Sequence, residues 1–459
     1  MTFSEFVSDF RRFCKRLTGR SHTSTFSATA DYPDPESLLQ KSLTRLGAEG
    51  ATELPELIAA KIEAVRHFHI ADMQTAVAIC TCGSSGSLLL ASYLEGHPDV
   101  IGLPMLYGQA IYPFFDHYQS MSLREKLLTY PFVRGSSSDD FDDSFKHAPA
   151  GITPIHYVAA VDAVLSVYRD RPASFLEQRR TFFVFVHIAY SVALGHKPRS
   201  ATPVIVHGQH IWDNELARRF VEDFQDARFI HTVRDPISNL GRLLARHTDS
   251  LIGAAMVVSH LSHADAPQTG MESRTRTIRF EDLHLNLEPT MRAVAAWLGL
   301  PFQPSLLESN FYGVPFVASR GATSWSGPRP DQAVRDIKNV SLTDRGMLYA
   351  TLYEDFASWN YPCPGVFAYA PIRVVTCLLL MWMPFRIEII VAKAFFKSLP
   401  KEGIGYALQG FTRLFAARVA IMVLLVADLV RRLAGRKTVL TLWPAASAQI
   451  ASAPITVRE

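Results

Sequence analysis

Four short apolar runs, each bounded by turn residues, alternate with amphipathic segments between residues 75 and 300. We predict that the runs are buried β-strands at Thr75–Thr81, Thr202–Val206, Arg228–Val233 and Thr275–Phe280. Apolar residues at intervals of three and four predict helices at Ser87–Leu94, Phe175–Leu194, Asp213–Phe224, Ile237–Leu244 and Glu288–Leu298. Strands that alternate with helices form parallel sheets, because each crossover returns the chain to the same end of the sheet. The expected fold class is therefore α/β, a parallel sheet flanked by helices.

Composition divides the chain into three predicted parts. Residues 1–36 hold an amphipathic helix, with Phe3, Phe6, Phe10 and Phe13 at helical spacing, and a linker rich in Ser, Thr, Asp and Pro. This helix lacks the apolar core of a signal peptide, so we expect a cytoplasmic protein; packing on the protein's own surface is the alternative for the helix. Residues 37–364 form the α/β domain, closed by a helix at Ser341–Trp359 that starts with a capping box, Ser341 and Asp344.

Residues 365–459 form a basic, apolar helical tail. This tail contains 12 Lys and Arg against 4 Asp and Glu, a net charge of +8, whereas the first 364 residues have a net charge of −5. Its apolar runs, such as Val374–Phe385, are shorter than the roughly 20 residues of a membrane-spanning helix. Basic residues beside apolar runs favour helices in a membrane interface, with packing on the body or a partner subunit as alternatives and a re-entrant hairpin as a further one. The acidic body disfavours a nucleic-acid partner.

The five cysteines, an odd number without any C-x-x-C pair, indicate neither a disulfide framework nor a zinc site. We therefore expect a reducing compartment and no bound metal.

A turn rich in glycine and serine, Cys82–Ser87, follows the first predicted strand and precedes a helix. Such a turn lets the backbone approach an anion, while N–H groups at the helix start point toward it. An ordinary strand-to-helix loop is the alternative. Leu88 and Leu89 stand where a Walker A loop has Lys and Ser or Thr, which disfavours phosphoryl transfer from MgATP.

A second candidate anion site follows the third predicted strand, where Arg234, Asp235 and Pro236 form a turn before a helix that carries Arg242. Arginine at the carboxyl end of a strand can bind a phosphate through two hydrogen bonds, and this edge is where open α/β sheets bind ligands. A buried ion pair of Arg234 with Asp235 or another carboxylate is the alternative.

Three segments in this order, CGSSGSLLLASYLEGHPDV, ARFIHTVRDP and IRFEDL leading into LGLP, resemble sulfotransferases that use 3′-phosphoadenosine 5′-phosphosulfate (PAPS). The similarity covers roughly Thr75–Phe302 and implies a fold with a P-loop-like turn that binds the phosphosulfate. It further implies transfer of a sulfuryl group to a hydroxyl-bearing acceptor, with PAPS as cofactor.

The resemblance also implies roles for individual residues. The 5′-phosphosulfate would be held by Gly83, Ser84, Ser85, Gly86 and Ser87. Arg234 would bind the 3′-phosphate, and the loop with Arg320 and Gly321 would supply a second cation to it.

Three positions depart from the family pattern. Ser84 stands where the family usually has Lys or Arg, Arg242 where it has Ser, and Phe280 where it has Tyr. Backbone N–H groups of the turn, with Arg242, Arg320 or Arg329, are the candidates to replace the missing cation.

The carboxylate that some family members place shortly after His-Pro-Asp-Val is absent. We expect His207 and His210, in the turn after Thr202–Val206, to be the candidate general bases, because a neutral histidine near its working pKa suits proton abstraction. A structural role is the alternative for each.

The expected function is that of a PAPS-dependent sulfotransferase, peripheral on the cytoplasmic face of a membrane, whose acceptor is lipid-linked, a glycan or otherwise membrane-associated. The alternative is a catalytically silent nucleotide-binding or scaffold protein at the membrane, which Ser84 and the missing carboxylate favour.

Overall fold

The computed structural model describes residues 33–48, 51–81, 85–107, 111–133, 151–209, 214–246, 271–315, 327–337 and 340–380, with short stretches and single residues beyond 380. The predicted amphipathic helix near the N-terminus lies outside the described residues.

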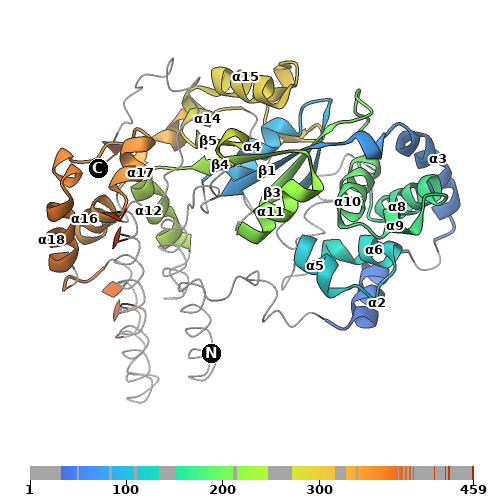
Figure 1. Ribbon diagram of the computed structural model, residues 1–459, viewed down its shortest axis with the longest axis horizontal. Helices are drawn as coiled ribbons and strands as arrows, with labels where there is room; N and C mark the ends of the chain where they lie inside the picture. Colours follow the sequence, from blue (N-terminus) through green and yellow to red (C-terminus); the bar gives the residue numbers. More distant parts are fainter. Residues whose placement is uncertain are drawn as a thin grey trace.

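The centre of the protein is a five-stranded parallel sheet with strand order β2-β3-β1-β4-β5 (Figure 1). The strands are β1 (Thr75–Thr81), β2 (Val100–Tyr107), β3 (Val204–Gln209), β4 (Asp226–Val233) and β5 (Thr275–Arg279). In the register, Thr232 of β4 lies opposite Thr81 of β1 and Ile278 of β5. The carboxyl ends of β1, β4 and β5 therefore meet at one edge, and the predicted α/β class is confirmed.

The alternation of side chains along β1 separates two cores. Ala76, Ala78 and Cys80 pack into one core, and Val77 and Ile79 into the other. Helices around the first core are α2 (Pro35–Leu46), α3 (Leu54–Arg66), α5 (Ile111–His117), α6 (Leu123–Val133), α8 (Ile155–Tyr168), α9 (Ala173–Leu176), α10 (Arg179–Ala193) and α11 (Asn214–Asp223). The second core is covered by α4 (Ser87–Leu94), α14 (Asp282–Leu285) and α15 (Leu287–Leu298).

Three of the elements in the structure differ from the predicted ones. The strand β2 was not predicted, because Gly102 and Pro104 interrupt an apolar run with residues that strands disfavour. The strand predicted at Thr202–Val206 is β3, which runs from Val204 to Gln209. The helix predicted at Phe175–Leu194 is interrupted at Gln178, whose backbone is extended.

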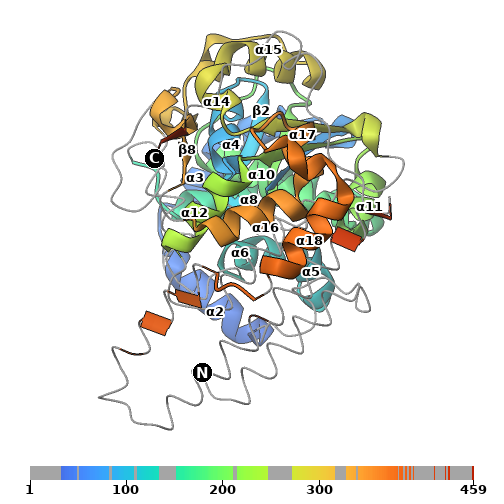
Figure 2. The same ribbon diagram turned by 90° about the vertical axis from the view of Figure 1, so that its left-hand side faces the viewer.

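A third core joins the C-terminal helices to the helix that follows β4. These helices are α12 (Pro236–Arg246), α16 (Leu342–Thr351), α17 (Tyr353–Ser358) and α18 (Ala370–Leu380). Ile237 and Leu240 of α12 pack with Leu348, Phe356 and Cys377. In Figure 2, α12, α16 and α18 lie on the same side of the molecule. The predicted capping box of Ser341 and Asp344 is confirmed at the start of α16, but the predicted single helix is divided at Leu352.

A buried arginine holds α18 on this core. Arg373 is 2% exposed, and its Nε donates to the carbonyl oxygen of Ala350 at 2.8 Å. Its Nη2 donates to Oε2 of Glu354 at 2.9 Å. The first turn of α18 is thus tied to both α16 and α17. Among the described helices, none combines the length and the apolar character that crossing a membrane requires.

We predict that Arg373→Ala lowers the free energy of unfolding by about 2 kcal/mol or more, because it removes the buried partner of the ion pair with Glu354 and the buried hydrogen bond to Ala350. Urea unfolding measures the loss. Arg66→Ala is the matched control, since Arg66 pairs with Glu63 while both side chains are mostly exposed, and such pairs contribute little. Equal stability of the two variants would contradict an anchoring role for Arg373.

Candidate active site

Three segments that leave the sheet at its carboxyl edge lie together. Ser85 and Gly86 follow β1, Arg234 and Asp235 follow β4, and Phe280 follows β5. The two predicted anion-binding segments are therefore neighbours in space, at the edge where open α/β sheets bind ligands.

The turn after β1 is packed tightly against its neighbours. Ser85 is fully buried, and its hydroxyl is 2.9 Å from that of Thr232 on β4. Gly86 precedes α4 with a φ of +91°, and a Cβ at this position would lie 2.6 Å from Cδ2 of Phe280. Ser87 is the first residue of α4, whose first backbone N–H groups have no carbonyl partner within the helix. This arrangement suits an anion, although Gly83 and Ser84 lie outside the described residues.

The structure brings the predicted Arg234 and Arg242 together. Nη2 of Arg234 donates to the backbone oxygen of Gln332 at 3.4 Å, and Nη2 of Arg242 donates to Oε1 of Gln332 at 2.8 Å. Gln332 lies in the short 3₁₀ helix η5 (Pro330–Ala333). The guanidinium of Arg234 stacks 4.1 Å from the ring centre of Phe280, so the residue in the family's Tyr position supports the arginine.

Asp235, considered above as a partner for Arg234, forms an ion pair with Arg335. The two side chains are 1% and 4% exposed, and Nε of Arg335 donates to Oδ2 of Asp235 at 2.9 Å. The other carboxylate oxygen accepts the backbone N–H of Ser238 at 2.8 Å, which caps α12. Arg335 was not predicted, since it lies 100 residues further along the chain.

Glu281, which lies shortly after β5, forms a hydrogen bond with the same turn. Its Oε1 accepts the backbone N–H of Asp235 at 3.2 Å, and its Oε2 accepts the hydroxyl of Tyr361 at 2.6 Å. Burial raises the pKa of Glu281, while the charge of Arg234 and the hydrogen bond from Tyr361 oppose that shift. Glu281 thus couples the Arg234 turn to the segment after α17.

A neutral histidine lies among these arginines. His284 of α14 is 3% exposed, its Nδ1 accepts the backbone N–H of Arg329 at 3.0 Å, and its ring meets that of Phe280 edge-on at 4.5 Å. Burial, with the positive charges of Arg234, Arg242 and Arg329, lowers the pKa of His284 to about 4, although Asp331 opposes this. Burial is the larger cause of this shift, and the nearby arginines add to it in keeping the imidazole neutral.

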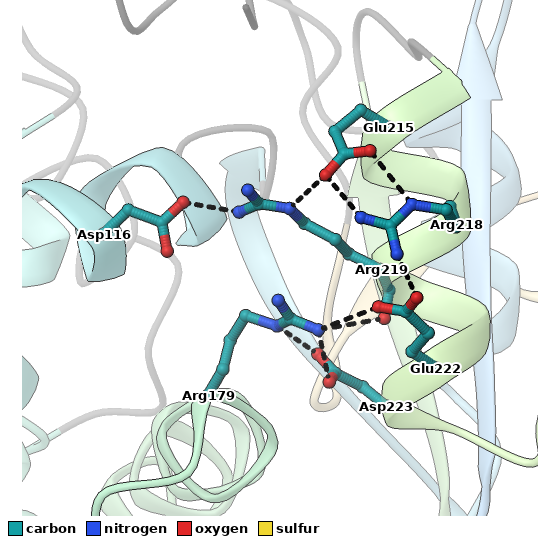
Figure 3. A network of polar contacts seen from close by, with 7 residues as sticks. All are labelled: Asp116, Arg179, Glu215, Arg218, Arg219, Glu222 and Asp223. Atoms are coloured by element: carbon teal, nitrogen blue, oxygen red, sulfur yellow. Dashed lines mark hydrogen bonds and ion pairs between the residues drawn. The ribbon is translucent and has the colours of Figure 1, made fainter.

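A second cluster of arginines, shown in Figure 3, is not a candidate anion site. It joins α5, α10 and α11, and its arginines all face carboxylates. The ion pairs are Arg179 with Asp223 and Glu222, Arg218 with Glu215 and Glu222, and Arg219 with Glu215 and Asp116. With four carboxylates around three guanidinium groups, this network is charge-compensated and links the helices instead.

The expected position of His207 in a turn is wrong, because β3 extends to Gln209 and contains it. The His207 side chain is 1% exposed, and its ring centre lies 4.7 Å from that of Phe183 and 5.4 Å from that of His187. These are the surroundings of a core side chain. A role as base stays a prediction for His207, and also for His210, which lies outside the described residues together with Arg320 and Gly321.

No group of three or more His, Cys, Asp and Glu side chains within the described ranges is placed to hold a metal ion.

We predict that Gly86→Ala destabilises the protein more than Gly299→Ala, by about 1–3 kcal/mol. Both glycines have a positive φ, but a Cβ at Gly299 would meet nothing within 4 Å, whereas one at Gly86 would meet Phe280. Differential scanning calorimetry compares the two variants. If they lose the same stability, the turn is not packed against Phe280 as described.

Comparisons with known proteins identify the family of the chain. A family model described as "Sulfotransferase family" matches residues 76–304. Similar solved structures include the sulfotransferase domain from the Synechococcus PCC 7002 olefin synthase, with 15% identity, 58% of this chain and 89% of that chain covered, and a TM-score of 0.37.

Two further structures are similar at the same level. The sulfotransferase domain from the curacin biosynthetic pathway has 15% identity, with 63% of this chain and 99% of that chain covered and a TM-score of 0.36. Sulfotransferase STF9 from Mycobacterium avium has 14% identity, with 65% of this chain and 85% of that chain covered and a TM-score of 0.30. A search of curated proteins gave no match. On the family match and its sequence motifs, the chain belongs to the sulfotransferase family.

Proposed function

We propose that the protein transfers a sulfuryl group from PAPS to a hydroxyl of a membrane-associated acceptor, such as a lipid-linked molecule or a glycan. The observation that carries this proposal is the convergence of Arg234 and Arg242 on Gln332, beside the glycine turn that starts α4. Membership of the sulfotransferase family supports the type of reaction.

The residues at the edge of the sheet fit the charges of this nucleotide. A 3′-phosphate is an anion that two guanidinium groups can neutralise, and Arg234 and Arg242 supply them. The start of α4, with Ser85, Gly86 and Ser87, offers backbone N–H groups for a second anionic group. When bound, PAPS supplies an activated sulfuryl group. The side chains named here bind and orient its charged ends.

The position of Arg242 suggests what two of the departures from the family pattern do. Because Arg242 and Arg234 contact the same glutamine, Arg242 fits the 3′-phosphate end and adds a cation there. It is therefore a poor replacement for the cation missing at Ser84. Losing one such group can slow a reaction on the order of 10²–10³-fold, and backbone N–H groups of the turn are the remaining candidates to offset this.

For the acceptor hydroxyl, His207 and His210 remain the proposed bases. The core environment of His207 favours His210, because a base must reach the proton that it abstracts.

We predict that the product nucleotide, 3′-phosphoadenosine 5′-phosphate, binds the wild-type protein and that Arg234→Ala weakens its binding at least tenfold. The reason is the loss of a charge-assisted hydrogen bond to phosphate. Isothermal titration calorimetry measures both affinities. Arg218→Ala, in the charge-compensated cluster of Figure 3, is the control and should bind like wild type. Absence of binding to the wild-type protein would overturn the proposal.

A catalytically silent nucleotide-binding or scaffold protein at the membrane is the second candidate, and Ser84 favours it. Incubation with sulfur-labelled PAPS and a membrane extract separates the two. Label transferred to a membrane component supports the enzyme, whereas nucleotide binding without transfer supports the silent protein.

The outer side of α18 supports docking on a membrane. Val375, Leu378, Leu379 and the following Trp382 are 53%, 54%, 65% and 86% exposed, while the charged Arg373 points inward. The net charge of +8 after residue 364 would favour anionic headgroups. We propose a peripheral association in which this apolar surface enters the headgroup region.

Co-flotation with vesicles that contain phosphatidylserine tests this association. The double variant Val375→Asp and Leu379→Asp should lose most of its vesicle binding, because two carboxylates enter the apolar surface. Ala173→Asp places a charge on exposed α9, on the opposite side of the molecule in Figure 1, and should bind like wild type. Unchanged flotation of the double variant would contradict docking through α18.

A further inference from the structure

His284 lies inside the cluster of arginines at the sheet edge, yet it belongs to none of the positions that the family resemblance assigns to the nucleotide. It is in α14, directly after β5, and α14 contacts η5, which carries Gln332. Its ring touches Phe280, and the Arg234 guanidinium stacks on the same Phe280 ring. His284 and Arg234 are thus held by one aromatic side chain.

The hydrogen bond at Nδ1 determines which ring nitrogen carries the proton. Nδ1 accepts the backbone N–H of Arg329 at 3.0 Å, so it must be unprotonated. In a neutral imidazole the other nitrogen, Nε2, then carries the hydrogen and is a donor. Within the described residues, Nε2 has no hydrogen-bond partner. The side chain is 3% exposed, and its Nε2–H remains as a donor that an oxygen atom of a ligand can accept.

The charges facing His284 indicate the kind of ligand. Arg234 comes from the turn after β4, Arg242 from α12 and Arg329 from the residue before η5; Asp331 is the carboxylate among these neighbours. Asp331 is in turn paired with Arg329 at 3.0 Å. An acceptor that enters here meets an excess of positive charge, so it should be an anion with several oxygen atoms, such as a phosphate.

We propose that His284 is a further ligand of the 3′-phosphate of the nucleotide, with Nε2–H donating to a phosphate oxygen beside Arg234 and Arg242. This inference rests on the proposed function. Because the Arg329 N–H fixes the tautomer, the donor is ready before the nucleotide arrives. Because the ring is neutral, it adds no repulsion among the arginines of the free protein. Arg234 and Arg242 attract any polyanion, and His284 then favours nucleotides that carry phosphate at the 3′ position.

Two substitutions of His284 distinguish the role of Nδ1 from the role of Nε2. In His284→Asn the amide oxygen can still accept the Arg329 N–H, as Nδ1 does, but the donor at Nε2 is lost. In His284→Gln the longer side chain places an amide N–H near the position of Nε2. Calorimetry measures the affinity of each variant for 3′-phosphoadenosine 5′-phosphate and for adenosine 5′-phosphosulfate, which lacks the 3′-phosphate.

The expected result is selective. His284→Asn should bind the 3′-phosphorylated nucleotide about tenfold more weakly, which is the loss of one hydrogen bond to a charged group, while its affinity for adenosine 5′-phosphosulfate changes less than twofold. His284→Gln should recover part of the lost affinity, and both variants should melt near the wild-type temperature.

Other outcomes overturn the inference in distinguishable ways. If His284→Asn binds both nucleotides like wild type, Nε2 contacts neither of them. If it loses both affinities equally, His284 has a structural role only. If the wild-type protein itself does not bind the 3′-phosphorylated nucleotide, the proposed function fails together with this inference.

Discussion

The buried ion pair of Asp235 and Arg335 is the contact on which the rest of the site depends. Taking both charges out of water is costly, and the pair is tolerated because its remaining hydrogen-bonding groups are satisfied. Asp235 also accepts from the backbone of Ser238, and Arg335 also donates to the backbone oxygen of Pro362 at 3.0 Å. The pair therefore fixes the start of α12 and, with it, the neighbouring Arg234.

The C-terminal helices and the segment after α17 pack against the carboxyl edge of the sheet, and several buried contacts hold them there. Besides the Arg335 pair, Tyr361 donates to Glu281, and Nη1 of Arg279 donates to the backbone oxygen of Trp359 at 3.4 Å. Arg279 also forms an ion pair with Asp282 at 2.7 Å, at the start of α14. The same helices include α18. The proposed nucleotide site and the proposed membrane surface thus belong to one continuously packed body.

Local patterns in the sequence were sufficient for part of this structure. The strand Thr75–Thr81 was predicted with its observed ends, because its apolar run is sharply bounded by turn residues. Arg234 and Arg242 were both predicted, because Arg234 lies in the turn directly after a recognisable strand and Arg242 lies eight residues later in the helix that follows. His284 and Arg335 were not, since their partners lie 45 and 100 residues away and leave no periodic signal. His207 was misplaced, because a strand's end depends on pairing with β1, which the apolar pattern of one segment does not report.

We infer that the turn after β4, the start of α14 and η5 form one anion-binding unit. Hydrogen–deuterium exchange of the full chain, with and without 3′-phosphoadenosine 5′-phosphate, tests it most directly. The nucleotide should slow amide exchange together in residues 233–242, 280–285 and 329–335. Slowed exchange in only one of these segments, or in none of them, would contradict the account.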